Sequence, residues 1–411
     1  MTVRYLRLAE VCEINPRLPR THGLVDDDEV SFVPMAAVDE VSGAIKSAEV
    51  RRYAEVKKGY TSFADGDVLF AKITPCMENG KAALADELVG GRGFGSTEFH
   101  VLRSGDQVMP EWLRYFVRRE SFRHDAKRNF TGTAGQQRVP ASFLQNAMIP
   151  VPSRAEQQRV VDQLSRAEGI VRMRRQAQQK AAELIPAIFV DTFGDPATNP
   201  KGWPMRTVRE LVARFEGGKN LQAASEGSTD YRILKVSAVT SGVYIEAESK
   251  PTPDDYEPPQ NHIVREGDML FSRANTEELV GATAVVRATN GRTLLPDKLW
   301  RFVWAEPVEQ AFMHALFQSA HVRQELGKLS SGTSASMRNI SQAKLFELRL
   351  LVPPLAQQSA FARHAEAVQS IRSQQTLALQ KATATFGGLL ARAFSAKGAA
   401  VAVHEAEEVV S

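Results

Sequence analysis

The pattern of apolar and polar positions divides each half of the chain into a part with short strands and a part with one long helix. In the first part, apolar runs follow a Gly-Asp pair, and other stretches alternate apolar with polar residues, as β-strands do. These stretches are residues 68–70, 98–102, 269–271 and 299–304. Residues 112–117 and 311–317 carry the spacing of helices that pack on strands. Each half is therefore predicted to begin with a mixed α and β domain.

A long helical segment closes each half. Apolar or small residues recur there in steps of four and three, which is the a/d spacing of a coiled coil. The two ladders are Val160, Leu164, Ala167, Val171, Ala181, Ile185 and Ile188, then Phe361, Ala365, Val368, Leu379, Ala382, Phe386 and Leu389. The seams also carry the polar residues Arg174, Gln178, Arg372 and Gln375. Each helix would be about 50 Å long. The alternative is two ordinary amphipathic helices, each packed on its own domain.

The two halves share short motifs in the same order. Residues 66–70 recur as 267–271, Gly132-Thr133 as Gly332-Thr333, residues 149–152 as 351–354, and Gln157-Gln158 as Gln357-Gln358. The offset stays between 200 and 202 throughout. Coincidence between turn residues is the alternative explanation. The constant order and offset instead predict one unit, a domain followed by a long helix, in two copies.

The predicted fold is α+β, with two tandem domains related by a pseudo-two-fold axis and joined by two long antiparallel coiled-coil spacer helices. The expected segments are residues 1–153 for the first domain, 154–193 for the first helix, 194–204 for a linker, 205–354 for the second domain and 355–395 for the second helix. Residues 396–411, which are mostly Ala, Val and Glu, are expected to be a disordered tail.

Composition excludes several classes of protein. The chain is 43% hydrophobic and 24% charged, with a net charge of +3, which permits DNA binding without arguing strongly for it. Its two cysteines, Cys12 and Cys76, form no C-x-x-C pair, so no metal site is expected. No signal peptide or membrane span is evident, and we expect a soluble cytoplasmic protein. Methyltransferase and phosphate-loop motifs are missing, which favours a protein without catalytic residues.

The copies differ most in two polar loops. The first follows the Gly-Asp strand, at residues 71–81 and 272–281; the second lies at residues 131–138 and 330–339. Lys and Arg can contact guanine or phosphate, Asn and Gln can pair with adenine, and Glu can accept from cytosine. The candidate DNA-binding residues are Lys72, Thr74, Glu78, Asn79, Lys81, Thr133, Gln136, Gln137, Arg138, Arg273, Asn275, Thr276, Glu277, Thr333, Ser334, Ser336, Arg338 and Asn339. The alternative for each loop is a solvated surface turn.

Two readers related by a two-fold axis suit a DNA target with two half-sites at a fixed spacing. The paired helices would then act as a ruler between the half-sites. The competing interpretation is a coiled-coil scaffold that binds proteins without reading bases. Such a scaffold would need no base-reading side chains in equivalent loops of both domains, so the loops favour DNA recognition.

Over essentially residues 1–395, the sequence resembles a known family, the specificity subunit of type I restriction–modification enzymes. The resemblance is carried by residues 70–81 and 273–281, both Gly-Thr loops, the prolines that precede Gln157-Gln158 and Gln357-Gln358, and the linker residues 199–204. One departure is that the second copy has Leu355-Ala356-Gln357-Gln358, where the family usually keeps the acidic residue that Glu156 supplies in the first copy.

The resemblance implies two target-recognition domains that bind a bipartite sequence in double-stranded DNA. It also implies protein partners, namely two adenine methyltransferase subunits and, for cleavage, restriction subunits driven by ATP. No cofactor is expected on this chain. S-adenosylmethionine, ATP and magnesium are expected on the partner subunits.

Overall fold

The computed structural model describes residues 3–19, 22–133, 135–221, 230–253, 256–334 and 337–395. The candidate residue Ser336 and the expected tail lie outside these ranges. The chain divides into two compact units. Unit 1 comprises residues 1–176 and 377–411, and unit 2 comprises residues 177–376. Each unit therefore contains one domain together with part of each long helix.

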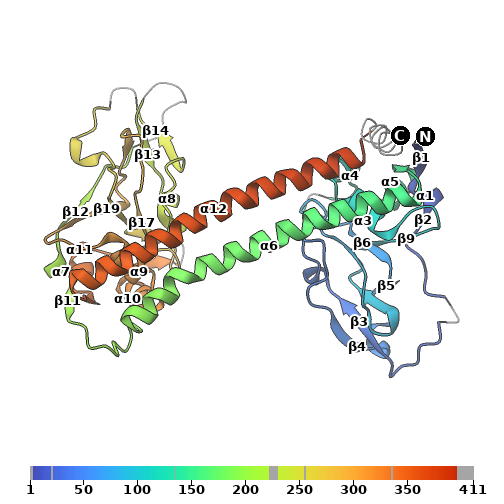
Figure 1. Cartoon of the computed structure of the whole chain (residues 1–411), viewed down its shortest axis with the longest axis horizontal. Helices are drawn as coiled ribbons and strands as arrows, with labels where there is room; N and C mark the ends of the chain where they lie inside the picture. Colours follow the sequence, from blue (N-terminus) through green and yellow to red (C-terminus); the bar gives the residue numbers. More distant parts are fainter. Residues whose placement is uncertain are drawn as a thin grey trace, which may run out of the picture. The chain divides into compact units, whose positions relative to one another are not determined.

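The domain of unit 1 is built on two four-stranded sheets (Figure 1). The first has the order β2 (Cys12–Ile14), β9 (Phe99–Ser104), β6 (Asp67–Ala71) and β7 (Ala82–Leu84), all antiparallel. The second has the order β4 (Glu49–Arg52), β3 (Glu29–Val33), β8 (Arg92–Gly95) and β5 (Thr61–Ala64), with β3 and β8 parallel. A separate pair joins β1 (Arg4–Arg7) to β10 (Met148–Val151).

Short helices cover the first sheet of unit 1. They are α1 (Leu8–Val11), α3 (Pro110–Arg118), α4 (Glu120–Arg128) and α5 (Ala141–Asn146). The remaining helical turns are α2 (Tyr53–Val56), η1 (Met35–Ala37) and η2 (Val89–Gly91). The apolar face of α3 fills the core, because Trp112, Tyr115 and Phe116 are at most 1% exposed. Burying such large aromatic surfaces is a main source of stability for the domain.

Unit 2 repeats the arrangement of the first sheet and of the separate strand pair. Its four-stranded sheet has the order β12 (Val212–Gly217), β19 (Leu299–Trp304), β15 (Met269–Ser272) and β17 (Thr283–Val285). The pair is β11 (Met205–Thr207) with β22 (Arg349–Leu351). Two three-stranded sheets follow: β14 (Ser249–Pro251), β13 (Arg232–Leu234) and β18 (Thr293–Leu294), then β16 (Ala274–Asn275), β21 (Met337–Asn339) and β20 (Ser331–Ser334).

The helices of unit 2 also match those of unit 1. They are α7 (Val208–Leu211), α8 (Ser237–Thr240), η3 (Gln260–His262), α9 (Gln310–Gln318), α10 (Ala320–Leu329) and α11 (Gln342–Phe346). The helices α9 and α10 follow β19 as α3 and α4 follow β9. The tandem repeat predicted from the sequence is therefore confirmed in the order of the elements.

A shared turn explains why the Gly-Asp pair recurs. Gly66 and Gly267 have φ values of 85° and 86°, which glycine adopts without strain. The carboxylate of Asp67 accepts a hydrogen bond of 2.8 Å from the backbone N–H of Ala64. Asp268 accepts the equivalent 2.8 Å bond from the residue three positions before it. The pair thus closes the turn that precedes β6 in unit 1 and β15 in unit 2.

The two long helices are α6 (Arg154–Phe193) and α12 (Leu355–Ala393). In unit 2 they lie antiparallel, because Gln178 donates a 3.1 Å hydrogen bond to Thr376 while Phe193 packs on Phe361. The two helices therefore contact each other, and the alternative in which each packs only on its own domain is wrong. The α+β fold with antiparallel spacer helices is confirmed.

The helix ends also belong to the domain cores, which the coiled-coil interpretation did not anticipate. In unit 1, Phe386 of α12 packs near Tyr115, and Leu164 of α6 lies in the same core. In unit 2, Phe189 of α6 stacks on Phe312 of α9. The apolar residues of the long helices therefore serve two purposes. Those near the helix ends pack in the domain cores, and they also contribute to the contact between the helices.

The glutamine motif needs a correction of one residue. Gln157 and Gln358 are the buried members of their pairs, at 0% and 3% exposed, whereas Gln158 and Gln357 are exposed. Gln157 is therefore equivalent to Gln358, and not to Gln357 as the letters alone suggested. Letter matching failed because two glutamines stand next to each other in both copies.

Candidate nucleic-acid interface

The backbone joins the two polar loops of unit 1 into one surface. The N–H of Val139 donates to the carbonyl of Lys72 at 2.9 Å. The N–H of Thr74 donates to the carbonyl of Gln137 at 3.0 Å. Arg138, between these two bonds, is half-buried. The residues singled out in separate loops are thus neighbours along a short ladder at the end of β6.

Unit 2 builds the same ladder from its own loops. Asn275 of β16 lies opposite Arg338 of β21, and the N–H of Ile340 donates to the carbonyl of Arg273 at 2.9 Å, as in unit 1. Each unit therefore presents one composite surface. The predicted residues brought together are Lys72, Thr74, Gln137 and Arg138 in unit 1, and Arg273, Asn275, Arg338 and Asn339 in unit 2.

Three of the candidate side chains in unit 1 hold the loop in shape. Glu78 accepts a hydrogen bond from the Thr74 hydroxyl and forms an ion pair with Lys127 of α4. These contacts, that with Lys127 first, lower the pKa of Glu78 below its usual value. The Lys81 ammonium donates to the carbonyl of Met35 at 3.1 Å. Contact between these side chains and DNA stays a prediction, and here they support the loop from within.

Opposite charges meet beside the ladder of unit 1. The Arg138 guanidinium makes a two-pronged ion pair with Glu98, at 2.8 and 2.9 Å, and the hydrogen bonds from Arg138 lower the pKa of Glu98. Lys72 lies near this pair, and within the described ranges its ammonium has no hydrogen-bond or ion-pair partner. Lys72 is therefore the cation of this loop that remains available to a phosphate or base.

The sequence analysis missed Glu98 and its counterpart Lys298. The carbonyl of Glu98 accepts from the N–H of Lys72, and the carbonyl of Lys298 accepts from the N–H of Arg273. The two residues therefore occupy equivalent positions with opposite charge. The signal that could have found them is their common place directly before the equivalent strands β9 and β19.

Arg273 in unit 2 is more firmly held than Lys72. Its Nε donates to the carbonyl of Asp297 at 2.7 Å, and its guanidinium lies 5.6 Å from the ring centre of Trp300. Asn275 uses its side-chain oxygen to accept the N–H of Thr276 at 2.8 Å. The ladder of unit 2 thus displays an oriented guanidinium where unit 1 displays a lysine.

Comparisons with known proteins address what such a chain does. Residues 2–181 match the family described as the type I restriction modification DNA specificity domain. The type I restriction enzyme EcoEI specificity subunit of Escherichia coli is 26% identical over 448 residues, covering 86% of this chain and 75% of that protein. The EcoAI specificity subunit of Escherichia coli is 39% identical over 155 residues, which is 38% of this chain and 26% of that protein.

Residues 2–181 thus match a type I DNA specificity domain, and the chain as a whole is similar to the specificity subunits of type I restriction–modification enzymes. A solved chain from work on complex assembly and conformational transition of the type I R-M system shares the fold, with a TM-score of 0.58 at 20% identity over 96% of this chain and 97% of that one. The relatives are specificity subunits, which are non-catalytic, so the expectation that this chain is not an enzyme is confirmed.

The other candidate residues belong to the same loops. Asn79, Thr133, Gln136 and Glu277 are exposed, whereas Thr276 is half-buried. Thr333 and Ser334 belong to β20 through their backbone. Within the described ranges, no protein group holds the side chains of Asn79, Thr133, Gln136 or Glu277. These four are free to meet a ligand.

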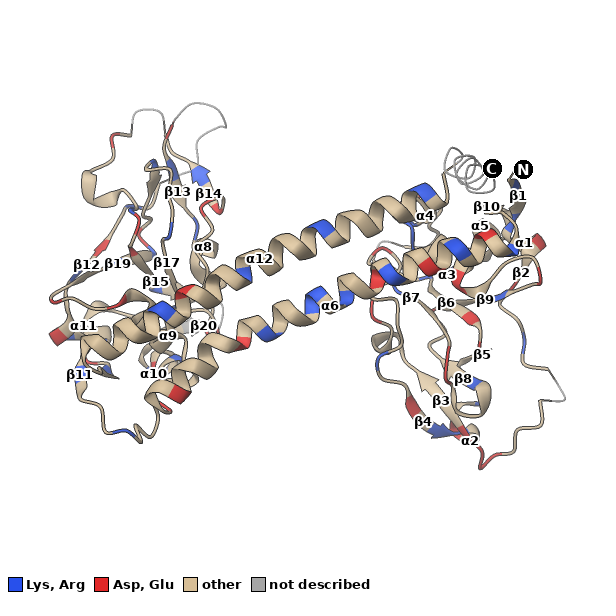
Figure 2. Ribbon diagram, viewed as in Figure 1, with Lys and Arg blue, Asp and Glu red and all other residues tan. Residues whose placement is uncertain are grey.

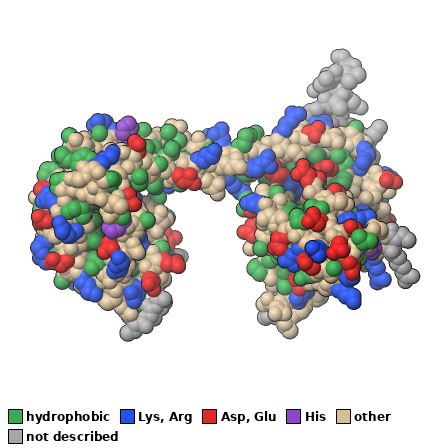
Figure 3. Space-filling view, turned by 90° about the horizontal axis from the view of Figure 1, so that it is seen from below, with side chains coloured by type: hydrophobic (Ala, Val, Ile, Leu, Met, Phe, Trp, Pro, Cys, Tyr) green, Lys and Arg blue, Asp and Glu red, His purple; other side chains and the backbone are tan. Residues whose placement is uncertain are grey.

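The surface of the chain carries charges of both signs. Figure 2 shows Lys and Arg together with Asp and Glu in both domains and along both long helices. The face in Figure 3 likewise intersperses acidic with basic side chains over each unit. A uniformly basic surface would give strong non-specific binding to DNA phosphates. The mixed surface instead leaves the ladders as the distinctive polar features.

Among the described residues, no helix has the length and apolar character needed to cross a membrane.

Proposed function

We propose that this specificity subunit recognises a bipartite DNA target, with one half-site contacted by each unit. The observation that carries the proposal is the repeated ladder, which keeps the same backbone hydrogen bonds while its side chains differ. Lys72 and Arg138 in unit 1 correspond to Arg273 and Asn339 in unit 2. A conserved backbone with changed donors and acceptors is what two different base sequences require.

The long helices set the spacing between the half-sites in this proposal. The helix α6 has 40 residues and α12 has 39, so each is about 60 Å long at 1.5 Å per residue. Both helices contribute to the cores of both units, which resists their detachment. Their polar seam contact, Gln178 with Thr376, favours one register over others.

The subunit also positions partner proteins on the target. From the family resemblance we assign it two adenine methyltransferase subunits and, in a cleavage-competent complex, restriction subunits. S-adenosylmethionine, ATP and magnesium belong to those partners in this proposal. Large apolar side chains that stay exposed on the helices, Ile170, Met173, Leu184, Val190, Ile371 and Leu377, support protein docking along them.

Footprinting of the subunit together with its methyltransferase partner tests the proposal. The expected pattern is two short protected segments separated by a gap in which any sequence is tolerated. The Lys72→Ala variant should weaken protection of one segment and leave the other unchanged. One contiguous protected site, or equal loss in both segments, would reject the division of labour between the units.

A further inference from the structure

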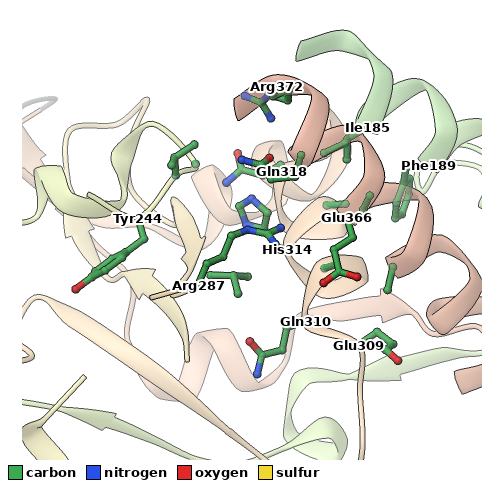
Figure 4. Close-up of a pocket in the computed structure, with 18 of the residues that line it drawn as sticks. Ile185, Phe189, Tyr244, Arg287, Glu309, Gln310, His314, Gln318, Glu366 and Arg372 are labelled. Carbon is green, nitrogen blue, oxygen red and sulfur yellow. The ribbon is translucent and has the colours of Figure 1, made fainter. Parts of the chain in front are cut away.

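Unit 2 contains a cavity beside the long helices. Its volume is about 780 Å³, and residues of α6, α9, α12 and the turn at residues 241–244 line it (Figure 4). Cavities that bind small molecules typically have about 300–1,000 Å³ and an apolar lining with a few polar groups. The cavity fits this description, since Ile185, Phe189 and Ala365 supply apolar walls. It lies apart from the ladder residues, so it needs a separate explanation.

The equivalent place in unit 1 is filled by side chains. Tyr115 of α3 packs on Phe386 of α12 with ring centres 6.3 Å apart. Glu168 of α6 accepts hydrogen bonds from Tyr115 at 3.0 Å, from Arg114 at 2.7 Å and from Arg118 at 2.6 Å. Burial alone would raise the pKa of Glu168, but the two arginines hold it below its usual value. Unit 1 thus carries its own carboxylate between two cations.

Unit 2 has lost both the filling rings and the carboxylate. The helices align with an offset of 200 between α3 and α9, and with an offset of 201 between α6 and α12. The residues at the equivalent positions are His314, Ala315, Gln318, Gln369 and Ile185. Alanine in place of Tyr115 and isoleucine in place of Phe386 leave the space empty. Glutamine in place of Glu168 removes the negative charge.

Two arginines that unit 1 lacks line this cavity. Arg287 and Arg372 stand where unit 1 has Asp86 and Val171. Neither guanidinium has a hydrogen-bond or ion-pair partner within the described residues. Figure 4 shows His314 beside Arg287, with Gln318 between His314 and Arg372. Unit 2 has therefore gained two cations near the position where glutamine replaces Glu168, and it has also gained Glu366, which stands where unit 1 has Ser165.

His314 marks the positive end of the cavity. Its Nδ1 lies 2.9 Å from the Thr283 hydroxyl. Burial, followed by the charges of Arg287 and Arg372, lowers the pKa of His314 to about 4, so the imidazole is neutral at neutral pH. The arginines are thus the cations at this end, and the field that His314 experiences is positive.

The rest of the lining supplies acceptors. The side-chain oxygen of Gln310 is buried and has no hydrogen-bond partner among the described residues. Glu309 accepts from the Ser359 hydroxyl at 2.6 Å, and Glu366 lines the cavity from α12. An unpaired buried acceptor costs free energy until a donor reaches it. A matching ligand therefore has an anionic group, an apolar body and a hydrogen-bond donor.

We propose that this cavity of unit 2 binds a small carboxylate with an apolar body and an N–H donor. The carboxylate takes the place between Arg287 and Arg372 that corresponds to Glu168 in unit 1. The apolar body fills the space left by the missing tyrosine and phenylalanine rings. The donor meets Gln310. This site is independent of DNA recognition, and its test contains no DNA.

Calorimetric titration of the full chain with N-acetyl-L-phenylalanine tests the proposal. We expect one ligand per chain, and at least about tenfold weaker binding of N-acetyl-L-phenylalaninamide, which lacks the charge, and of inorganic phosphate, which lacks the apolar body. No binding at millimolar ligand, or equal binding of the uncharged amide, would overturn the assignment.

Two variants locate the binding site. The double variant Arg287→Gln, Arg372→Gln removes the cations and should weaken binding of N-acetyl-L-phenylalanine at least about tenfold. Ala315→Tyr restores the unit 1 residue and should abolish binding while the circular dichroism spectrum stays unchanged. Should the tyrosine variant fail to fold, the arginine variant still decides, because both arginines line the cavity and their guanidinium groups have no partner in the part of the chain that the structure describes. Undiminished binding to the arginine variant would place the ligand elsewhere and refute the proposal.

Discussion

Gln157 and Gln358 make the same connection in the two halves of the chain. Gln157 donates to the carbonyl of Pro152 at 3.0 Å and accepts the N–H of Met109 at 2.8 Å. Gln358 donates to a proline carbonyl five residues before it at 2.8 Å and accepts the N–H of Glu309 at 3.1 Å. Each glutamine thus ties the first turn of a spacer helix to the start of the helix that fills the domain core.

Replacing this glutamine should destabilise the protein. Gln157→Ala leaves the N–H of Met109 and two carbonyls without their partner, so we expect the free energy of unfolding to fall by about 1–3 kcal/mol. Gln158→Ala is the matched control, because Gln158 is exposed and, among the described residues, its side chain bonds only Asp162 on the same helix. Urea denaturation followed by circular dichroism measures both. Equal midpoints for the two variants would show that the buried link contributes nothing.

Lys72 and Lys81 of the first loop should have different roles, because we expect Lys72 to contact DNA and Lys81 to stabilise the loop. Lys72→Ala should change the preference at one half-site by about 1–3 kcal/mol if the contact is to a base. Lys81→Ala should instead lower stability, because it removes the bond to Met35. Competition binding on a library of half-site sequences, with thermal unfolding alongside, distinguishes them. A uniform loss over all sequences would assign Lys72 to the phosphates.

Replacing Glu168, which forms ion pairs with two arginines in unit 1, should destabilise the protein. Glu168→Gln leaves Arg114 and Arg118 without their counter-charge, and breaking a buried pair in this way costs about 3–5 kcal/mol. The folded pKa of Glu168 is lowered, so its contribution is present above the unfolded pKa and is lost as pH falls through the folded value. The free energy of unfolding should therefore fall less steeply with decreasing pH for the variant than for the unchanged protein. The same dependence of unfolding free energy on pH in the variant and the unchanged protein would contradict the stabilising role of the Glu168 carboxylate.

His314 should make unit 2 sensitive to mild acid. Its folded pKa of about 4 lies below the unfolded value of 6.5, so the unfolded chain binds the extra proton first. Stability should therefore fall as pH drops from about 6.5 to about 4, by at most about 1.4 kcal/mol per pH unit from this group. His314→Gln should flatten that slope. An identical slope would mean that His314 is already protonated in the folded protein beside Arg287 and Arg372.

Helix length should set the gap between half-sites. Inserting about seven residues, or two turns, at the middle of α6 and of α12 adds about 10 Å to each helix and keeps the apolar seams in register. The half-site sequences should remain the same while the tolerated gap lengthens by about three base pairs, at 3.4 Å each. Selection of bound DNA from a library with variable gaps measures this. An unchanged gap would show that the length of the helices does not set the spacing between the half-sites.

Much of the fold could be predicted from the sequence because it depends on repeated local signals. The Gly-Asp turns before β6 and β15 require a positive φ and a capping carboxylate, which only that residue pair supplies at low cost. The long helices follow from sustained apolar spacing. The fate of the helix ends could not be predicted, since Phe386 and Phe189 find their partners across large sequence separations.

The candidate site could be predicted in part. Loop polarity located the ladders, but it could not distinguish Lys72, which has no partner in the described structure, from Lys81, which is bound internally. Glu98 escaped notice because a single acid before a strand has no local signature. The cavity in unit 2 was also invisible, because it depends on Ala315 and Ile185 being smaller than their counterparts in unit 1.

Sequencing of methylated bases in cells that carry this subunit and its methyltransferase partner tests the bipartite proposal most directly. The account predicts adenine methylation within a split motif, in which two short specified segments flank a fixed number of unspecified base pairs. Cells with Lys72→Ala should show relaxed specification in one segment only. A single uninterrupted motif, or relaxation of both segments together, would contradict the account.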